Sequence, residues 1–314
     1  MRNERIGMAQ GARGDMLFAA PWSALEQCLL AAICLATLFF TLVTPPFQAP
    51  DENQHYMKAL LLSEGGVLTT QQGEAIGASL PRAGIDLHAV DFPTDVPATV
   101  RRFDAAKLGH SWNADASRPG TVFAEFPNVA SYAPTLYAPG AAGLLIGDAL
   151  GLPRLGRFYA GRIVNALVAL ALLIAALRLL PFGRMAMLGT ALLPTFAYQI
   201  GSMSPDAVIN GMGFLGLALA LRVGFMDRGS AGLVLAAPLL ALAKGVYLPL
   251  MAAGLRWPQH RRDMRMWLVL GAMALGAAAF IGWMKYSGGS QALYHIMSRK
   301  TGESVLTAPL ADQL

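Results

Sequence analysis

The feature that most constrains this chain is a run of apolar residues as long as a membrane span. It extends from about Ala24 to Thr44, and about twenty apolar residues in a helix cross the hydrocarbon core of a bilayer. Pro45 and Pro46 follow directly and prevent simple continuation of that helix. The run is too long for the apolar region of a secretory signal peptide, and no convincing small-x-small cleavage site follows it. We therefore expect an uncleaved transmembrane helix over residues 24–44.

The composition is typical of an integral membrane protein. Of the 314 residues, 55% are hydrophobic and 14% are charged, whereas a soluble domain carries about 25% charged residues. The formal net charge of +5 does not indicate a nucleic-acid partner, because the basic residues cluster in short loops between apolar runs. Both cysteines, Cys28 and Cys34, lie within the first run, where packing is the expected role. We therefore expect an all-α polytopic membrane protein that binds the lipid bilayer and no nucleic acid.

Further apolar runs predict a transmembrane bundle over residues 160–284. If the N-terminal tail, residues 1–23, is cytoplasmic, the basic turn at 178–184 and the basic end at 222–228 are cytoplasmic too, as the positive-inside rule requires. We therefore place this tail in the cytoplasm and residues 45–159 outside it. The runs predict helices at about residues 160–180, 185–203, 207–225, 231–255 and 266–284.

The extracytoplasmic loop begins with the stretch Pro45–Gly66, PPFQAPDENQHYMKALLLSEGG. Asp51 is a typical helix N-cap, and Gln54 three residues later completes a capping-box pattern. The pattern predicts a helix over residues 51–64, which the Gly65-Gly66 pair ends. Because this amphipathic helix directly follows a span, we expect it to lie in the membrane interface with its acidic end facing water.

The rest of this loop carries weaker patterns. Residues 66–128 are polar and rich in proline and glycine, and predict a small folded or half-ordered loop domain with solvated charges. Neither His88 nor His110 has a second histidine or a cysteine at i+3 or i+4, so the sequence shows no typical zinc-ligand spacing there. We expect a re-entrant or interfacial helix at about residues 136–150, because Pro134 interrupts an apolar segment that is short for a span.

We predict a broken hairpin at residues 231–255, because a single span there would conflict with the positive-inside rule. A single span there would place the basic loop 256–265 outside the cytoplasm. Lys244 and Pro249 interrupt the apolar stretch, so one short helix can rise to this break and a second can return. Both ends of the hairpin then lie inside, and the tail at residues 285–314 lies outside.

Five motifs in this order carry a resemblance to a known family. They are Pro45–Gly66, the aromatic–proline stretch Tyr132–Tyr137, Arg162–Asn165, Ser204–Asp206 and Leu242–Tyr247. The chain resembles the domain-of-unknown-function 2142 family of predicted bacterial membrane proteins, whose members are similar to membrane glycosyltransferases of the GT-C superfamily. The resemblance covers about Ala24 to Tyr286. Family members usually continue through several more spans, which leaves open whether Leu314 is the natural C-terminus.

The resemblance implies a GT-C-like bundle with a long first extracytoplasmic loop that carries interfacial helices. It also implies residence in the bacterial inner (cytoplasmic) membrane and an active site at its outer face. The implied reaction transfers a sugar from a polyprenyl-phosphate-linked donor to a cell-envelope acceptor, either a glycan or a glycolipid. In that superfamily an acidic residue of the first loop acts as general base or orients the acceptor. By motif position this residue is Asp51, with Glu52 beside it.

The candidate site residues each have a structural alternative. Asp51 and Glu52 are the candidate catalytic residues, although a cap and a charge near the helix dipole would explain them as well. The candidate substrate-binding residues are His55, Arg162, Asp206 and Lys244. A charge inside an apolar stretch needs a partner or a water-filled cavity, which favours a donor-phosphate contact for Lys244 over snorkelling to the interface. A solvated interfacial histidine is the expected alternative for His55, and a helix cap for Asp206.

Two other classes of protein stay open. One is a transporter or flippase for lipid-linked glycans, and the other is a non-catalytic membrane subunit. An apolar groove between spans with cations at its mouth would favour lipid binding over a purely structural subunit. Departure of the donor phosphate needs cations or a metal ion. No cofactor follows with certainty from the sequence, and a divalent metal is one alternative.

Overall fold

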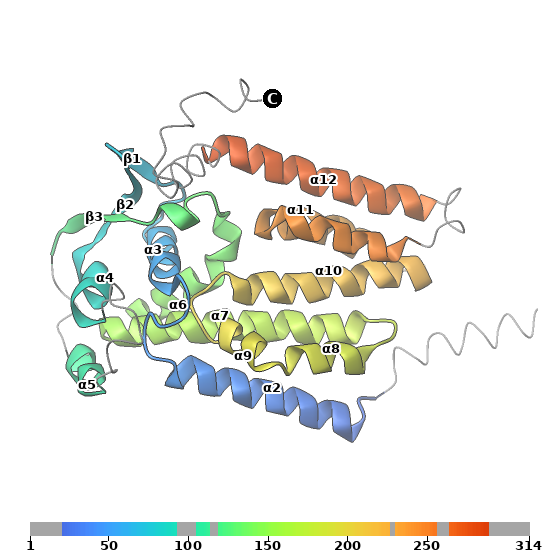
Figure 1. Ribbon diagram of the computed structural model, residues 1–314, viewed down its shortest axis with the longest axis horizontal. Coiled ribbons are helices and arrows are strands. Elements are labelled where there is room, and N and C mark those ends of the chain that lie inside the picture. Colours follow the sequence, from blue (N-terminus) through green and yellow to red (C-terminus); the bar gives the residue numbers. More distant parts are fainter. Residues whose placement is uncertain (1–20, 93–104, 114–118, 227–229, 256–263, 289–314) are drawn as a thin grey trace, which may run out of the picture. The chain divides into compact units, whose positions relative to one another are not determined.

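The computed structural model describes residues 21–92, 105–113, 119–226, 230–255 and 264–288 (Figure 1). The predicted tail positions 1–20, most of the basic loop (256–263) and the C-terminal residues 289–314 lie outside the described part. The chain divides into two compact units, and each is described by itself. The first unit comprises residues 1–43, 165–202 and 206–279, and the second comprises residues 44–164, 203–205 and 280–314.

The first unit begins with α2 (Ala24–Val43), which fills the predicted first span. A capping box starts this helix. The Ser23 amide donates to Glu26 Oε2 at 2.8 Å, and the Glu26 amide donates to Ser23 Oγ at 3.2 Å. The helix ends at Val43, before the proline pair that the sequence places at its boundary.

The predicted single helix at residues 185–203 is wrong. The chain forms two short helices there, α8 (Arg184–Ala191) and α9 (Pro194–Ile200). Pro194 has no amide hydrogen to donate and disfavours helical backbone in the residue before it. Leu193 accordingly has ψ 132°, so the first helix ends and Pro194 opens the next in its favoured first-turn position.

The remaining helices of the first unit fold out and back along one another. After α10 (Asp206–Met226), α11 (Ser230–Ala243) returns beside it (Figure 1), and a Cβ added at Gly216 would lie 3.0 Å from Leu240. Lys244 is extended, and the 3₁₀-helix η4 (Gly245–Gly254) then runs back along α10. Gly224 permits close approach there, since a Cβ on it would lie 2.2 Å from the Gly254 carbonyl oxygen. The break therefore falls at the lysine, and the two pieces form a hairpin.

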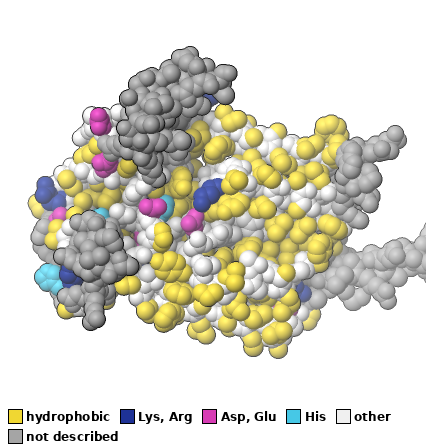
Figure 2. Space-filling model, in the orientation of Figure 1, with side chains coloured by type: hydrophobic (Ala, Val, Ile, Leu, Met, Phe, Trp, Pro, Cys, Tyr) yellow, Lys and Arg dark blue, Asp and Glu magenta, His cyan; other side chains and the backbone are white. Residues whose placement is uncertain are grey.

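Four of the described helices are long and apolar enough to cross a membrane. They are α2, α7 (Arg154–Leu179), α10 and the Met266–Tyr286 part of α12 (Met264–Tyr286). Many of their exposed side chains are apolar: Leu35 and Phe39 of α2 are 66% and 56% exposed, and Figure 2 shows many hydrophobic side chains on the surface. Such a surface is stable against lipid and not against water. The predicted class of all-α polytopic membrane protein is confirmed.

The second unit contains a small antiparallel sheet that the sequence did not predict. The strands β1 (Thr70–Gln72), β2 (Ala75–Pro81) and β3 (Thr121–Glu125) pair in the order β1-β2-β3. Gly77 sits where backbones come close, since a Cβ on it would lie 1.8 Å from the Ala124 carbonyl oxygen. The polar loop region is therefore folded around a central strand.

Short helices complete the second unit around this sheet. The predicted interfacial helices correspond to α3 (Glu52–Ser63) and α6 (Ala138–Ala149), which contact each other. The smaller elements are α4 (Arg82–Asp86), the π-helix η1 (Leu87–Asp91), α5 (Ala106–Asn113) and the 3₁₀-helices η2 (Pro127–Val129) and η3 (Pro134–Leu136). The contact between α3 and α6 is the frame on which the candidate site is built.

Candidate functional site

The loop between α2 and α3 has an unusual backbone. Phe47 (φ 61°) and Asp51 (φ 54°) are the non-glycine residues with positive φ in the described part of the chain. This left-handed conformation costs about 1–3 kcal/mol for a residue with a side chain, and it persists only where surrounding contacts enforce it. Both residues lie in the stretch that carries the candidate acids, so the contacts that enforce the loop define the site.

Glu52 supplies the central contacts of this loop. Its carboxylate accepts hydrogen bonds from the Phe47 amide at 2.9 Å and from the Met203 amide at 2.8 Å. It also accepts two bonds from the Arg162 guanidinium, from Nε at 2.8 Å and from Nη2 at 2.6 Å. Both side chains are fully buried, with 0% exposure. Glu52 therefore joins the loop, the chain at Met203 and the first turns of α7.

Arg162 extends the same network to the start of the loop. Its Nη1 donates to the Thr44 carbonyl oxygen at 2.6 Å, and its Nη2 donates to the Pro45 carbonyl oxygen at 3.1 Å. The guanidinium also lies over the Phe158 ring, 4.7 Å from its centroid. A buried guanidinium is stable only when its charge and its N–H groups are matched in this way. The pair therefore fixes the course of the chain from residue 44 to residue 52.

The carboxylate of Asp51 is held at the surface by this loop. Asp51 occupies the N-cap position of α3, but its side chain makes no capping hydrogen bond, so the predicted capping box is wrong. An N-cap side chain reaches the helix amides from an extended backbone, and the left-handed backbone of Asp51 directs it elsewhere. Gln54, the other predicted member of the box, instead accepts a bond from the Asn128 amide at 3.2 Å.

His55 is buried among aromatic rings, so the expectation of a solvated histidine is wrong. Its Nδ1 lies 3.0 Å from the Tyr137 hydroxyl. Its ring stacks on Tyr132 with an interplanar angle of 19° and 6.2 Å between ring centroids. Both tyrosines belong to the aromatic–proline motif and lie on either side of η3, whereas His55 lies in α3. These residues are partners in one cluster.

Lys58 is a buried cation that the sequence reasoning missed. It is 2% exposed, and its Nζ donates to the carbonyl oxygens of Val67 at 3.2 Å and Ala130 at 3.5 Å. Burial lowers the pKa of Lys58 from 10.5 to about 8. No local sequence signal indicates this burial, because one of its carbonyl partners, Ala130, lies 72 residues away.

The first unit carries a separate ion pair at the hairpin break. Lys244 Nζ lies 3.3 Å from Asp206 Oδ1, and the two side chains are 37% and 33% exposed. Asp206 opens α10, and Lys244 is the extended residue between α11 and η4. Asn165 donates to the Ser202 carbonyl oxygen at 2.9 Å, as expected of a polar residue that joins packed helices.

An apolar groove begins next to this ion pair. Its volume is about 360 Å³, and it lies between α9, α10 and η4. Two lining residues follow the charged residues closely in sequence. Ile209 lies about one helical turn after Asp206, and Tyr247 lies three residues after Lys244. The ion pair is therefore close to one end of the groove. Further lining residues are Leu193, Phe196, Phe214, Leu217 and Leu250. The groove is suited to a hydrocarbon chain.

The structure brings the six predicted site residues together in two sets. Asp51, Glu52, His55 and Arg162 belong to the second unit, and Asp206 and Lys244 belong to the first. Among the described residues, no group of three histidine, cysteine, aspartate or glutamate side chains could hold a metal ion. We derive no step through a metal ion.

Four membrane-length apolar helices and a fully buried ion pair beside an exposed acid define a polytopic membrane protein with a preorganised loop. A comparison with protein-family models matches residues 34–311 to the family described as "Predicted membrane protein (DUF2142)". The chain belongs to this family. Parallel searches of curated proteins and of solved structures give no match.

Replacing one partner of the buried pair should destabilise the protein strongly. We expect Glu52→Gln and Arg162→Met each to lower the free energy of unfolding by about 3–5 kcal/mol, because each leaves an uncompensated buried charge or donor set. Chemical unfolding of the full chain in detergent micelles measures this. The exposed Glu74 supplies the control, and Glu74→Gln should change stability by less than about 0.5 kcal/mol. Equal stability of Glu52→Gln and Glu74→Gln would contradict the structural role of the pair.

The buried Lys58 should make stability depend on pH. Below about pH 8 the lysine is protonated in both states and its buried charge weakens the fold in full. Between pH 8 and 10.5 the unfolded chain keeps a proton that the folded chain has released, so the free energy of unfolding rises, by up to about 3 kcal/mol. Unfolding of the native chain and of Lys58→Met at pH 7.5 and pH 10 isolates this effect. The free energy of unfolding of Lys58→Met should rise less between the two pH values than that of the native chain. An identical rise in both proteins would refute the lowered pKa of Lys58.

Proposed function

We propose that this protein is a membrane glycosyltransferase that moves a sugar from a polyprenyl-phosphate-linked donor to a cell-envelope acceptor. The acceptor is a glycan or a glycolipid, and the reaction takes place at the outer face of the bacterial inner membrane. The N-terminus is cytoplasmic in this proposal. The five motifs resemble those of the domain-of-unknown-function 2142 family, whose similarity to GT-C enzymes suggests the reaction class, and the geometry of the first loop supports it.

The observation that carries the proposal is the exposed carboxylate of Asp51 on a strained loop. A general base must reach the proton that it takes and must keep a lone pair free to accept it. The Asp51 side chain makes no capping bond to α3 and is exposed. Its left-handed backbone lies directly before Glu52, whose buried pair with Arg162 fixes the loop, and its carbonyl oxygen accepts a bond from the His55 amide at 3.0 Å. Strain that is enforced from outside the residue is typical of functional sites.

The roles of the neighbouring residues follow from their burial. Glu52 and Arg162 are fully buried and bonded to each other, so we assign them positioning roles, although both were candidates for direct contact with substrate. His55 is 7% exposed and is held by Tyr132 and Tyr137. We assign this cluster to the acceptor, because stacked rings and hydroxyl groups suit sugars. Asp51 is then the catalytic base.

The proposed step balances as an inverting substitution at the sugar. The acceptor hydroxyl oxygen forms a bond to the anomeric carbon, and Asp51 takes the hydroxyl proton. The bond from that carbon to the phosphate oxygen breaks, and polyprenyl phosphate leaves with the electron pair. Within the first unit, we assign Lys244 to contact with a donor phosphate, with Asp206 as its positioning partner. The apolar groove beside this pair is assigned to the polyprenyl chain.

Each alternative class accounts for fewer of these features. A flippase for lipid-linked glycans would use the groove and Lys244 but has no use for an exposed acid on an enforced loop. A non-catalytic subunit would need neither the groove nor the acid. The transferase proposal uses all three features.

Replacing Asp51 should abolish sugar transfer without affecting the fold. We expect Asp51→Asn to lower transfer at least about a hundredfold, because loss of a general base typically costs about 10²–10⁴ in rate. Transfer is measured in membranes that contain the full chain and a labelled polyprenyl-phosphate sugar pool. The matched control is Glu74→Gln, which removes another exposed charge of the second unit and should leave transfer unchanged.

Two results would overturn the proposal. Equal transfer by the native chain and Asp51→Asn at equal protein level would remove Asp51 as the base. Absence of transfer in both, while a labelled lipid still crosses the bilayer, would identify a transporter instead.

A further inference from the structure

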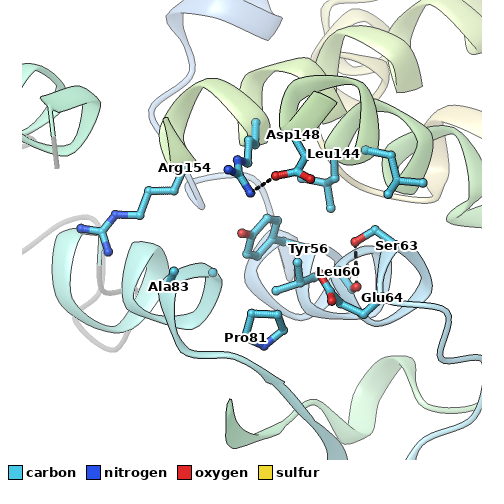
Figure 3. A pocket seen from close by; sticks show the side chains of 12 residues that line it. Tyr56, Leu60, Ser63, Glu64, Pro81, Ala83, Leu144, Asp148 and Arg154 are labelled. Carbon is cyan, nitrogen blue, oxygen red and sulfur yellow. Dashed lines mark hydrogen bonds and ion pairs between the residues drawn. The ribbon is translucent and has the colours of Figure 1, made fainter. Parts of the chain in front are cut away.

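A second cavity lies at the opposite end of α3 from Asp51. Asp51 immediately precedes the helix and Ser63 is its last residue, so about 18 Å of helix separates them. The cavity has a volume of about 180 Å³ and is lined by α3, by the β2–α4 junction, by α6 and by the start of α7. Figure 3 shows Tyr56, Leu60 and Ser63 of α3, with Glu64 directly after them, on one side and Asp148 and Leu144 of α6 on another. None of these residues takes part in the proposed transfer.

The cavity carries both signs of charge at its opening. Arg157 forms an ion pair with Asp148, drawn as a dashed line in Figure 3, and its Nε also donates to the Leu152 carbonyl oxygen at 3.0 Å. The two side chains remain 35% and 59% exposed, so both can still meet a ligand from outside the protein. Glu64 adds a second exposed carboxylate from α3. The opening therefore offers one cation and two carboxylates.

Arg154 also borders the cavity but is committed elsewhere. Its Nη2 lies 3.0 Å from Asp91 Oδ2, and its guanidinium points away from the other labelled side chains in Figure 3. The available cation of the site is Arg157.

The rim of the cavity is apolar on the side of α6. Leu145 lines the cavity and is 52% exposed, and Ile146 of the same helix and Leu150 directly after it are 48% and 69% exposed. In a membrane protein, exposed leucine and isoleucine side chains of this kind contact acyl chains. A ligand that enters here meets hydrocarbon contacts and opposite charges within a few residues of one helix.

We propose that this cavity binds the head group of a zwitterionic phospholipid that carries a primary ammonium. Arg157 binds the phosphate, since a guanidinium offers paired donors to phosphate oxygens. Asp148 and Glu64 accept hydrogen bonds from the ammonium, and the exposed face of α6 contacts the acyl chains. The bound lipid is a structural ligand of the second unit, and this site is independent of the sugar-transfer proposal.

Lipid competition followed by native mass spectrometry tests the site. The full chain is reconstituted in nanodiscs that contain equal parts of phosphatidylethanolamine, phosphatidylcholine and phosphatidylglycerol, and the lipids that remain bound after release are counted. We expect phosphatidylethanolamine to be retained at least about tenfold over the other two, because one charge-assisted hydrogen bond is worth about a factor of ten. Phosphatidylcholine lacks ammonium hydrogens, and phosphatidylglycerol lacks the ammonium.

The variants separate the two halves of the site. Arg157→Gln should reduce retention of phosphatidylethanolamine about tenfold, and Asp148→Asn should remove the preference over phosphatidylglycerol. Arg178→Gln is the matched control, since this arginine is exposed at the other end of α7, and it should bind as the native chain does. Far-ultraviolet circular dichroism checks that each variant is folded. Equal retention of the three lipids by the native chain, or unchanged retention by a folded Arg157→Gln, would overturn the proposal.

Discussion

A buried ion pair organises the second unit of this protein. Glu52 and Arg162 are 110 residues apart in sequence, and both are fully excluded from solvent. Withdrawing two charges from water is costly, and the cost is offset only when every donor and acceptor is matched. Here the matching groups are backbone amides and carbonyls of the loop that leads into α3. The charges are therefore satisfied only when the loop has this one conformation, which gives the loop a unique structure.

This arrangement separates the residues that hold the site from the residue that is free to react. The pair uses its polar atoms to fix Phe47 and the start of α3, and it leaves the carboxylate of Asp51 exposed at the surface. Preorganisation of this kind lowers the cost of bringing a base to its substrate. In the first unit, the Asp206–Lys244 pair has a comparable place, because it joins the start of α10 to a break between two short helices. In both units a charge pair fixes an irregular backbone segment.

Local sequence signals predicted the parts of the fold that depend on local physics. Proline fixed the end of the first span, and the charge rule with Lys244 indicated the break after α11. Pro194 is an equally local signal for a helix boundary, but the continuous apolar run led to the prediction of a single helix. The structure has two helices there, and the second begins at Pro194. The burial of Glu52, His55 and Lys58 was not predictable in this way, because each of them has a partner that lies 72 to 151 residues away. A capping box also forms at Ser23–Glu26 and not at Asp51–Gln54, since the loop contacts of Glu52 override the local cap preference.

Amide hydrogen exchange tests most directly whether the buried pair sets the loop. The Phe47 and Met203 amides both donate to the Glu52 carboxylate, although they lie in distant parts of the sequence. Exchange is compared between the native chain and Arg162→Met under conditions where the helices α2 and α10 keep their protection. The account predicts that both amides are protected in the native chain and that both exchange at least about tenfold faster in the variant. Equal protection of Phe47 and Met203 in the two proteins would contradict it.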